Sequence, residues 1–242
     1  MTAKPEIIFE MNLSNAWRET MDRIIKLPGH EIAPLVLTLT DFTESAKIRS
    51  VLDESLKKDG KASIQTVAET IFPDSLYQYF GQDRKVLYRE YKAILSRIHD
   101  IDKRNKRGTY FERLIAYDGK INQLEIIISS YLKNKSVRRS KLQASIFDPR
   151  KDHIKNRYQG FPCLQHVTFS TTKQGGLILN SFYALQYLYE RAYGNWLGLI
   201  NLGKFMANEL QLHFEGFNCY IGVEQLDHLT KTSAKDLLKM TS

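Results

Sequence analysis

Cysteine is scarce in this chain: among 242 residues only Cys163 and Cys219 occur, so a disulfide framework is excluded. Sparse cysteine is typical of proteins from a reducing compartment. No apolar run approaches the roughly 18 residues that suggest a membrane-spanning helix. The amino terminus also lacks the pattern of a secretory signal peptide. We therefore expect a soluble, cytoplasmic protein.

Glycine-rich phosphate motifs are missing as well. Neither a G-x-G-x-x-G fingerprint nor a Walker loop occurs, and no two Cys or His residues have the spacing of metal ligands. We expect no bound metal. If the protein uses a nucleotide, side chains must hold its phosphate.

Positive charge is in excess, with 35 Lys and Arg against 27 Asp and Glu, a net charge of +8. This balance favours an anionic partner such as a nucleotide phosphate or nucleic acid, although part of it is expected to be solvated surface. With 43% hydrophobic residues the chain can bury a substantial core. Without repeats or an evident linker, residues 1–242 are predicted to form a single domain.

The apolar pattern changes between helical and strand periods along the chain, which predicts an α+β fold. Helices are predicted over 12–25, 44–57, 62–72, 76–101, 121–134, 200–212 and 234–240, and strands over 30–42, 142–147, 163–169, 177–183 and 213–220.

Cys163 follows Pro162 and begins an alternating run, so its thiol should be held in a defined direction at the start of a strand. With His166 three residues later and cations nearby, such a thiol could be activated as a nucleophile. The alternative is that Cys163 is a small buried apolar residue, as most free cysteines are.

Two further features are candidates for chemistry. Glu69 lies beside the apolar helical face of 62–72 and becomes an acid or base only if that face lines a pocket. Arg138, Arg139 and Lys141 form a tight cationic cluster before a strand. Arginine donors match phosphate oxygens, so this cluster could clamp a phosphate.

Taken in order, these features resemble the thymidylate synthase family. The matching text is Phe161-Pro162-Cys163 opening a strand, the turn at Gly175-Gly176, the return strand to Tyr183, and Asn195 within Asn-Trp-Leu-Gly-Leu-Ile. Upstream, residues 124–139 match the family's helix and double-arginine loop, and Gln143 to Pro149 match its next strand. Tyr110 and the Ala68-Glu69 helix also match. The resemblance is firm over about residues 120–212.

The resemblance implies that Cys163 adds to C6 of a pyrimidine ring and that Glu69 organises proton transfer. Asn195 would read the pyrimidine edge, and Tyr110 would lie in the substrate site. The implied fold is one mixed sheet covered by helices. Arg138 and Arg139, with Lys141, would bind phosphate across a homodimer formed through a sheet face. The activity would be transfer of a methyl or hydroxymethyl unit to C5 of a nucleotide such as dUMP, with 5,10-methylenetetrahydrofolate as cofactor.

Several family positions differ here. The arginine that binds phosphate near the cysteine is replaced by Ala184, and Arg191 is the predicted substitute. The sugar-binding Asp-x-His-x-Tyr is replaced by Val223, Gln225 and Asp227. These losses leave a second interpretation, a non-catalytic homologue that binds a nucleotide, RNA or a protein partner. In a third, the chain is a structural dimer in which Cys163 is an inert core residue.

Overall fold

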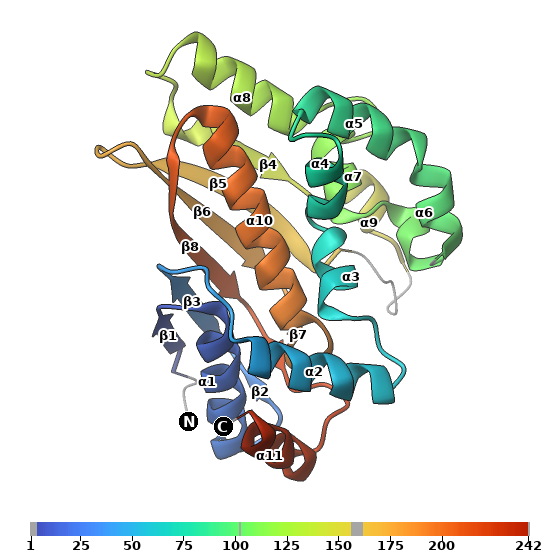
Figure 1. Cartoon of the computed structure of the whole chain (residues 1–242), viewed down its shortest axis with the longest axis vertical. Coiled ribbons are helices and arrows are strands. Elements are labelled where there is room, and N and C mark those ends of the chain that lie inside the picture. The colour runs from blue at the N-terminus through green and yellow to red at the C-terminus, as the bar shows by residue number, and fades with distance from the viewer. Residues whose placement is uncertain (1–3, 102, 156–161, 242) are drawn as a thin grey trace.

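The computed structural model describes residues 4–101, 103–155 and 162–241 and has an α+β architecture with a mixed sheet (Figure 1). The α+β prediction is confirmed. Six strands form the main sheet in the order β1-β3-β8-β6-β5-β4. Their bounds are β1 Glu6–Glu10, β3 Leu35–Leu39, β8 His213–Ile221, β6 Gly176–Tyr183, β5 Leu164–Thr171 and β4 Gln143–Ser145.

Parallel and antiparallel pairs mix within this sheet. The β1–β3 and β6–β8 pairs are parallel, whereas β3–β8, β5–β6 and β4–β5 are antiparallel. The β5–β6 hairpin turns at Gly175, which has a φ of +83°. That left-handed conformation is costly for a residue with a Cβ. This preference of glycine explains why the Gly175-Gly176 pair predicted the turn correctly.

Helices gather on one face of the sheet, with α10 crossing it (Figure 1). On this face α10 packs against β6 and β8 and α1 against β1 and β3. The helices are α1 Leu13–Lys26, α2 Ala46–Lys58, α3 Ile64–Glu69, α4 Asp74–Tyr79, α5 Arg84–Ala93, α6 Leu95–Ile101, α7 Tyr110–Ile115, α8 Gln123–Lys133, α9 Pro149–Asp152, α10 Tyr193–Leu210 and α11 Lys231–Met240, with 3-10 turns at Lys103–Arg107 and Arg139–Lys141.

The opposite face of the sheet is open. Side chains alternate along each strand, and on this face Ile7, Phe9, Phe182 and Tyr220 are 61%, 67%, 41% and 46% exposed. Apolar residues on the helix-covered face, among them Ile8, are fully buried.

A second sheet of three short strands, which the sequence patterns did not predict, lies in the order β2-β9-β7. Its strands are β2 Glu31–Ile32, β9 Glu224–Gln225 and β7 Gln186–Tyr187. A π-helical turn, Leu188–Ala192, follows β7 directly and leads into α10. The small sheet therefore connects the return strand β6 to the start of the central helix.

The helix predicted over 76–101 is wrong, because that segment contains α4, α5 and α6. Gly81 and Gln82 both have positive φ, 65° and 62°, which ends α4. Asp83 then caps α5 by accepting from the backbone amides of Lys85 and Val86 at 2.8 and 3.2 Å. Among the described helices, none is both long and apolar enough to cross a membrane.

Candidate active site at the start of strand β5

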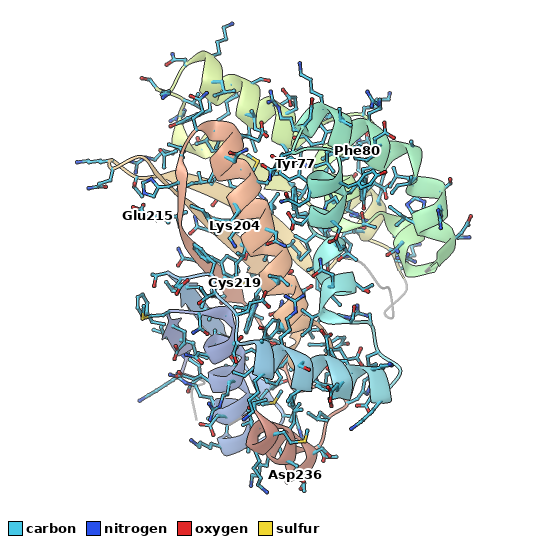
Figure 2. All side chains as sticks on the ribbon, viewed as in Figure 1. Tyr77, Phe80, Lys204, Glu215, Cys219 and Asp236 are labelled. Carbon is cyan, nitrogen blue, oxygen red and sulfur yellow. The ribbon has the colours of Figure 1, made fainter. Side chains whose placement is uncertain are left out.

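Cys163 lies immediately before β5, at the end of the sheet where β6 finishes. Its carbonyl oxygen accepts a hydrogen bond from the Ala184 amide at 3.1 Å, which ties it to the residue after β6. Its side chain is half-buried. Cys219, by contrast, is fully buried on β8 in the sheet crossed by α10 (Figure 2). Of the two thiols, only Cys163 is open to a reactant.

The Cys163 thiol is subject to two opposing influences. Burial raises its pKa, because a thiolate loses hydration there, and the nearby Arg191 guanidinium opposes that rise. Arg191 is the charged group that acts on this thiol within the described chain. It extends from the π-helical turn, and no ion pair joins it to a described carboxylate.

Tyr110, the first residue of α7, lies against the same thiol. The backbone amides of Cys163 and Leu164 face its phenol oxygen, and the Arg191 charge also acts on it. Burial raises the pKa of Tyr110 well above its usual range, so the phenol stays protonated. Thr109 fixes this position through a capping box with Glu112 at the start of α7.

Helix α3, which carries Glu69, contacts both α10, which carries Asn195, and α7, which carries Tyr110. A Cβ added at Gly194 of α10 would lie 2.6 Å from the Cβ of Val67, so the two helices touch at their backbones. At the end of α3, the Thr70 carbonyl accepts from the Phe111 amide of α7 at 3.0 Å. Residues next to Asn195 and next to Tyr110 therefore both contact α3, the helix of Glu69.

Asn195 is 5% exposed and follows Gly194, at the point where α10 touches α3. Its amide offers both a donor and an acceptor, which is what the edge of a pyrimidine ring requires. Asn195 is therefore suited to a ligand.

Glu69 is held by its own neighbours. Its Oε1 accepts from the Ser75 hydroxyl at 2.7 Å, the Ser75 amide at 3.1 Å and the Gln65 amide at 2.7 Å. The bond from the Ser75 amide satisfies a backbone donor in the first turn of α4, so this oxygen of Glu69 has a structural role. The three bonds to Oε1 leave Oε2 as the oxygen that could act on a substrate or a water.

The cationic cluster lies elsewhere in the same chain. Arg138, Arg139 and Lys141 are exposed, and Leu142, which follows them, bonds to Phe169 near the far end of β5. Five residues separate Leu164 from Phe169, which at about 3.3 Å per strand residue is about 17 Å. Within one chain the structure brings Arg191, but not this cluster, to Cys163.

His166 does not serve the thiol. It hydrogen bonds with Gln143 at 3.0 Å and Ser145 at 3.5 Å, both on β4. Burial lowers its pKa, which favours the neutral ring. The prediction that His166 activates Cys163 is therefore wrong. Phe161, the first residue of the Phe-Pro-Cys match, lies outside the described residues.

Sequence reasoning missed three buried polar residues close to this site. The hydroxyl of Tyr183, the amide of Gln186 and both carboxylate oxygens of Glu224 are buried without a hydrogen-bond partner among the described residues. Tyr183 interacts electrostatically with Cys163, Tyr110 and Glu224. Gln186 and Glu224 lie in strands of only two residues, which are too short to show an alternating pattern. Tyr183 ends a strand that was predicted, but the pattern gives no sign that its hydroxyl is buried without a partner.

Glu190, Asp227 and His228 bring oxygen and nitrogen ligands within 4.8 Å of one another. The ammonium group of Lys61 already pairs with Glu190. We assign no metal to this cluster. A surface groove of about 1070 Å³ lies between α1 and α11, and none of its lining residues belongs to the predicted site.

Comparison with protein-family models gives no match, and comparison with curated protein sequences gives no significant match.

Proposed function

We propose that this chain is a thymidylate synthase-like transferase in fold and activity, adding a methyl or hydroxymethyl unit to C5 of a pyrimidine nucleotide such as dUMP. One observation carries the proposal. The half-buried thiol of Cys163 lies beside Arg191 and Tyr110, in the part of the molecule where α3 links the neighbours of Tyr110 to those of the buried Asn195.

The chemistry follows from these groups. The thiolate sulfur of Cys163 forms a bond to C6, and the C5–C6 π electrons move onto C5 and O4. The Asn195 amide would donate to O4, where negative charge develops. C5 then bonds an electrophile, loses its original proton to a base, and the thiolate leaves as the C5–C6 double bond forms again. Oε2 of Glu69 is the proposed site that holds a water for this proton transfer.

By resemblance the one-carbon donor is 5,10-methylenetetrahydrofolate. The described residues do not provide a fitting cradle for it. In the family a carboxy-terminal segment closes over folate, whereas here α11 packs against α1 and α2, with Ala234 and Leu237 buried. We derive no step through the cofactor, and the proposal rests on the covalent addition at C6.

Phosphate binding is assigned to Arg191 within the chain and to Arg138, Arg139 and Lys141 of a second copy. The last three are exposed and lie about 17 Å along β5 from Cys163 of their own chain. A homodimer formed through the open sheet face would let a cluster at one end of β5 serve the other copy's site.

The composition of the open face supports such a dimer. Across four strands a hydrogen-bond ladder runs from Thr38 to Asn218 at 2.9 Å, from Asn218 to Asn180 at 2.9 Å, and from Asn180 to Thr168 at 3.2 Å. These polar groups are satisfied inside the sheet, so covering them leaves few unpaired. Apolar Phe9, Phe182 and Tyr220 flank the ladder.

Exchange of the C5 hydrogen tests the proposal without a cofactor. In deuterated buffer, reversible addition of Cys163 to C6 lets C5 take up a deuteron and release its proton, so the H5 resonance of dUMP should fade. Cys163→Ser should abolish the exchange. Cys219→Ala, at the buried thiol, should retain it. With 5-fluoro-dUMP, mass spectrometry should find an adduct on Cys163.

Two observations favour the second function, a non-catalytic nucleotide-binding homologue. Burial raises the pKa of the thiol, and Glu69 is bonded to Ser75. Binding of dUMP or dCMP by calorimetry, with neither exchange nor adduct for any pyrimidine nucleotide, would establish this function in place of the transferase.

A further inference from the structure

The π-helical turn Leu188–Ala192 carries Arg191, whose charge acts on the Cys163 thiol. π turns are rare, and they occur frequently at functional sites. This one begins directly after β7 and ends at α10. Such a turn needs support from the surrounding fold to persist.

Support comes first from α1 and α2. The Trp17 indole N–H donates to the Leu188 carbonyl at 3.2 Å. On the α2 side, the Tyr189 hydroxyl donates to Asp59 at 2.7 Å and also bonds with Ser55 at 2.8 Å. All three hydrogen bonds bridge more than 100 residues of sequence, so they are made by the tertiary fold.

A second clamp holds Glu190, the residue next to Arg191. Its carboxylate forms an ion pair with Lys61, and the two side chains are 12% and 29% exposed. Its backbone amide donates to Asp227 Oδ2 at 3.2 Å. The Asp227 carboxylate is itself buried, with 1% of the side chain exposed. Glu190 is thus fixed through both its side chain and its backbone.

Arg191 differs from its neighbours on the turn. Leu188, Tyr189 and Ala192 are buried, and Glu190 is paired. The guanidinium of Arg191 has no ion pair with the described part of the chain, and its charge acts on Cys163 and Tyr110. The other four residues of the turn are therefore buried or paired, whereas the charge of Arg191 acts on the thiol.

We propose that Lys61 and Glu190 are positioning residues that hold Arg191 against Cys163 through the clamped π-helical turn. The inference deepens the proposed function, since it takes Cys163 as the reacting group, but it concerns the thiol itself. A fixed guanidinium stabilises the thiolate, because the opposite charge compensates for lost hydration. A mobile guanidinium stabilises the thiolate only during the time that it spends near the sulfur.

The test is the pH dependence of Cys163 alkylation by iodoacetamide in the full chain, followed by peptide mass spectrometry. Only the thiolate reacts, so the midpoint of the rate profile gives the thiol pKa. The groups that face this thiol are Arg191 from the turn, Tyr110 from α7 and Tyr183 from β6. Cys219 is buried and serves as the unreactive internal reference.

Arg191→Met should shift the Cys163 midpoint upward by about one pH unit, a tenfold slower alkylation at a fixed lower pH. Lys61→Met and Glu190→Gln should shift it in the same direction. Combining either change with Arg191→Met should add nothing, because all three act through one guanidinium. Lys61→Arg, which keeps the ion pair, should restore the wild-type midpoint.

Lys239→Met is the matched control, since Lys239 forms an exposed ion pair with Asp236 of α11. Figure 2 labels Asp236. The Lys239→Met change should leave the midpoint unchanged. A shift for Arg191→Met with none for Lys61→Met or Glu190→Gln would overturn the positioning role, provided circular dichroism shows folded variants. No shift for Arg191→Met would overturn the whole inference.

This readout separates the inference from the proposed function. If the midpoints shift as expected but dUMP shows no C5 exchange, the clamp exists and the transferase proposal fails. If exchange occurs and Cys163 forms the adduct while no midpoint shifts, the transferase stands and the clamp fails.

Discussion

Gly194 and Val67 lie so close that a Cβ built on the glycine would be 2.6 Å from the Cβ of the valine and 2.8 Å from the Ile64 carbonyl oxygen. One turn along α10, a Cβ at Gly198 would be 2.6 Å from the Ala68 carbonyl oxygen. The two glycines let α3 rest on the backbone of α10. This contact sets Glu69 and Asn195 relative to each other.

Gly194→Ala is therefore expected to destabilise the fold. The added methyl cannot be accommodated by a flexible side chain, because it meets backbone and a β-branched residue, and overpacking of this kind costs about 1–3 kcal/mol. The intrinsic helix preference of Ala over Gly, about 1 kcal/mol, offsets only part of this cost. Urea unfolding followed by circular dichroism measures the difference.

Gly216 provides the control, because a Cβ there would find no heavy atom closer than 3.6 Å. Gly216→Ala should leave the unfolding free energy unchanged or raise it slightly, since the unfolded chain loses freedom. Equal effects of the two substitutions would show that the α3–α10 contact is not as tight as described.

Glu224 predicts a fall in stability with rising pH. Its carboxylate is fully buried without a hydrogen-bond partner among the described residues, and burial raises its pKa well above 4.5. Above about pH 4.5 the unfolded chain loses this proton while the folded chain keeps it. The unfolding free energy should then fall by about 1.4 kcal/mol per pH unit until the folded pKa is reached.

Glu224→Gln keeps the size of the side chain and removes the titration. Urea unfolding between pH 5 and pH 8 should show a weaker pH dependence for this variant than for the wild type. Asp227, whose pKa burial also raises, contributes a slope of the same sign in both proteins. Parallel slopes for the two would exclude Glu224 as a buried protonated group.

Caps, glycine turns and apolar periods in the sequence predicted the helices and turns that depend on neighbouring residues. The helix predicted over 12–25 is α1, and Asn12 caps it by accepting from the Asn15 amide at 2.9 Å. The glycine pair marked the β5–β6 turn. These elements depend on short-range hydrogen bonds and on one apolar period, both of which are visible in a single sequence.

Elements decided by distant partners were not predicted. β1 pairs with β3 about 30 residues later and exposes both Ile7 and Phe9, so its alternation does not read as a half-buried strand. The π-helical turn depends on Asp59 and Lys61, about 130 residues away. For the site, the sequence indicated Cys163, Tyr110 and Arg191, but not Tyr183 or Glu224, because burial of a polar residue is set by its tertiary neighbours.

The proposed dimer gives a prediction for the open sheet face. The rings of Phe182 and Tyr220 on this face are tilted against each other with their centroids 5.5 Å apart, and the residues are 41% and 46% exposed. Phe182→Asp would place a charge in an interface that excludes water, which is strongly unfavourable without a partner. Sedimentation velocity should show a dimer for the wild type and a monomer for the variant.

Tyr79 is 81% exposed on α4, which lies on the helical side of the molecule. Tyr79→Asp should leave the sedimentation coefficient unchanged. A wild-type monomer at all accessible concentrations would contradict the dimer and, with it, the assignment of Arg138 and Arg139 to a second copy.

The buried ion pair between Arg113 and Asp152 should be among the costliest to break. Arg113 donates to Asp152 Oδ1 at 2.9 Å and to the Ile146 carbonyl at 3.0 Å, and the two residues are only 8% and 5% exposed. Asp152→Ala would leave the guanidinium buried without its counter-charge, which costs about 3–5 kcal/mol. Because Arg113 belongs to α7, which begins at Tyr110, the same variant should also loosen the helix that faces Cys163. Urea unfolding measures the first effect and faster hydrogen exchange in α7 the second. Asp236→Ala, which breaks an exposed pair with Lys239, should change neither.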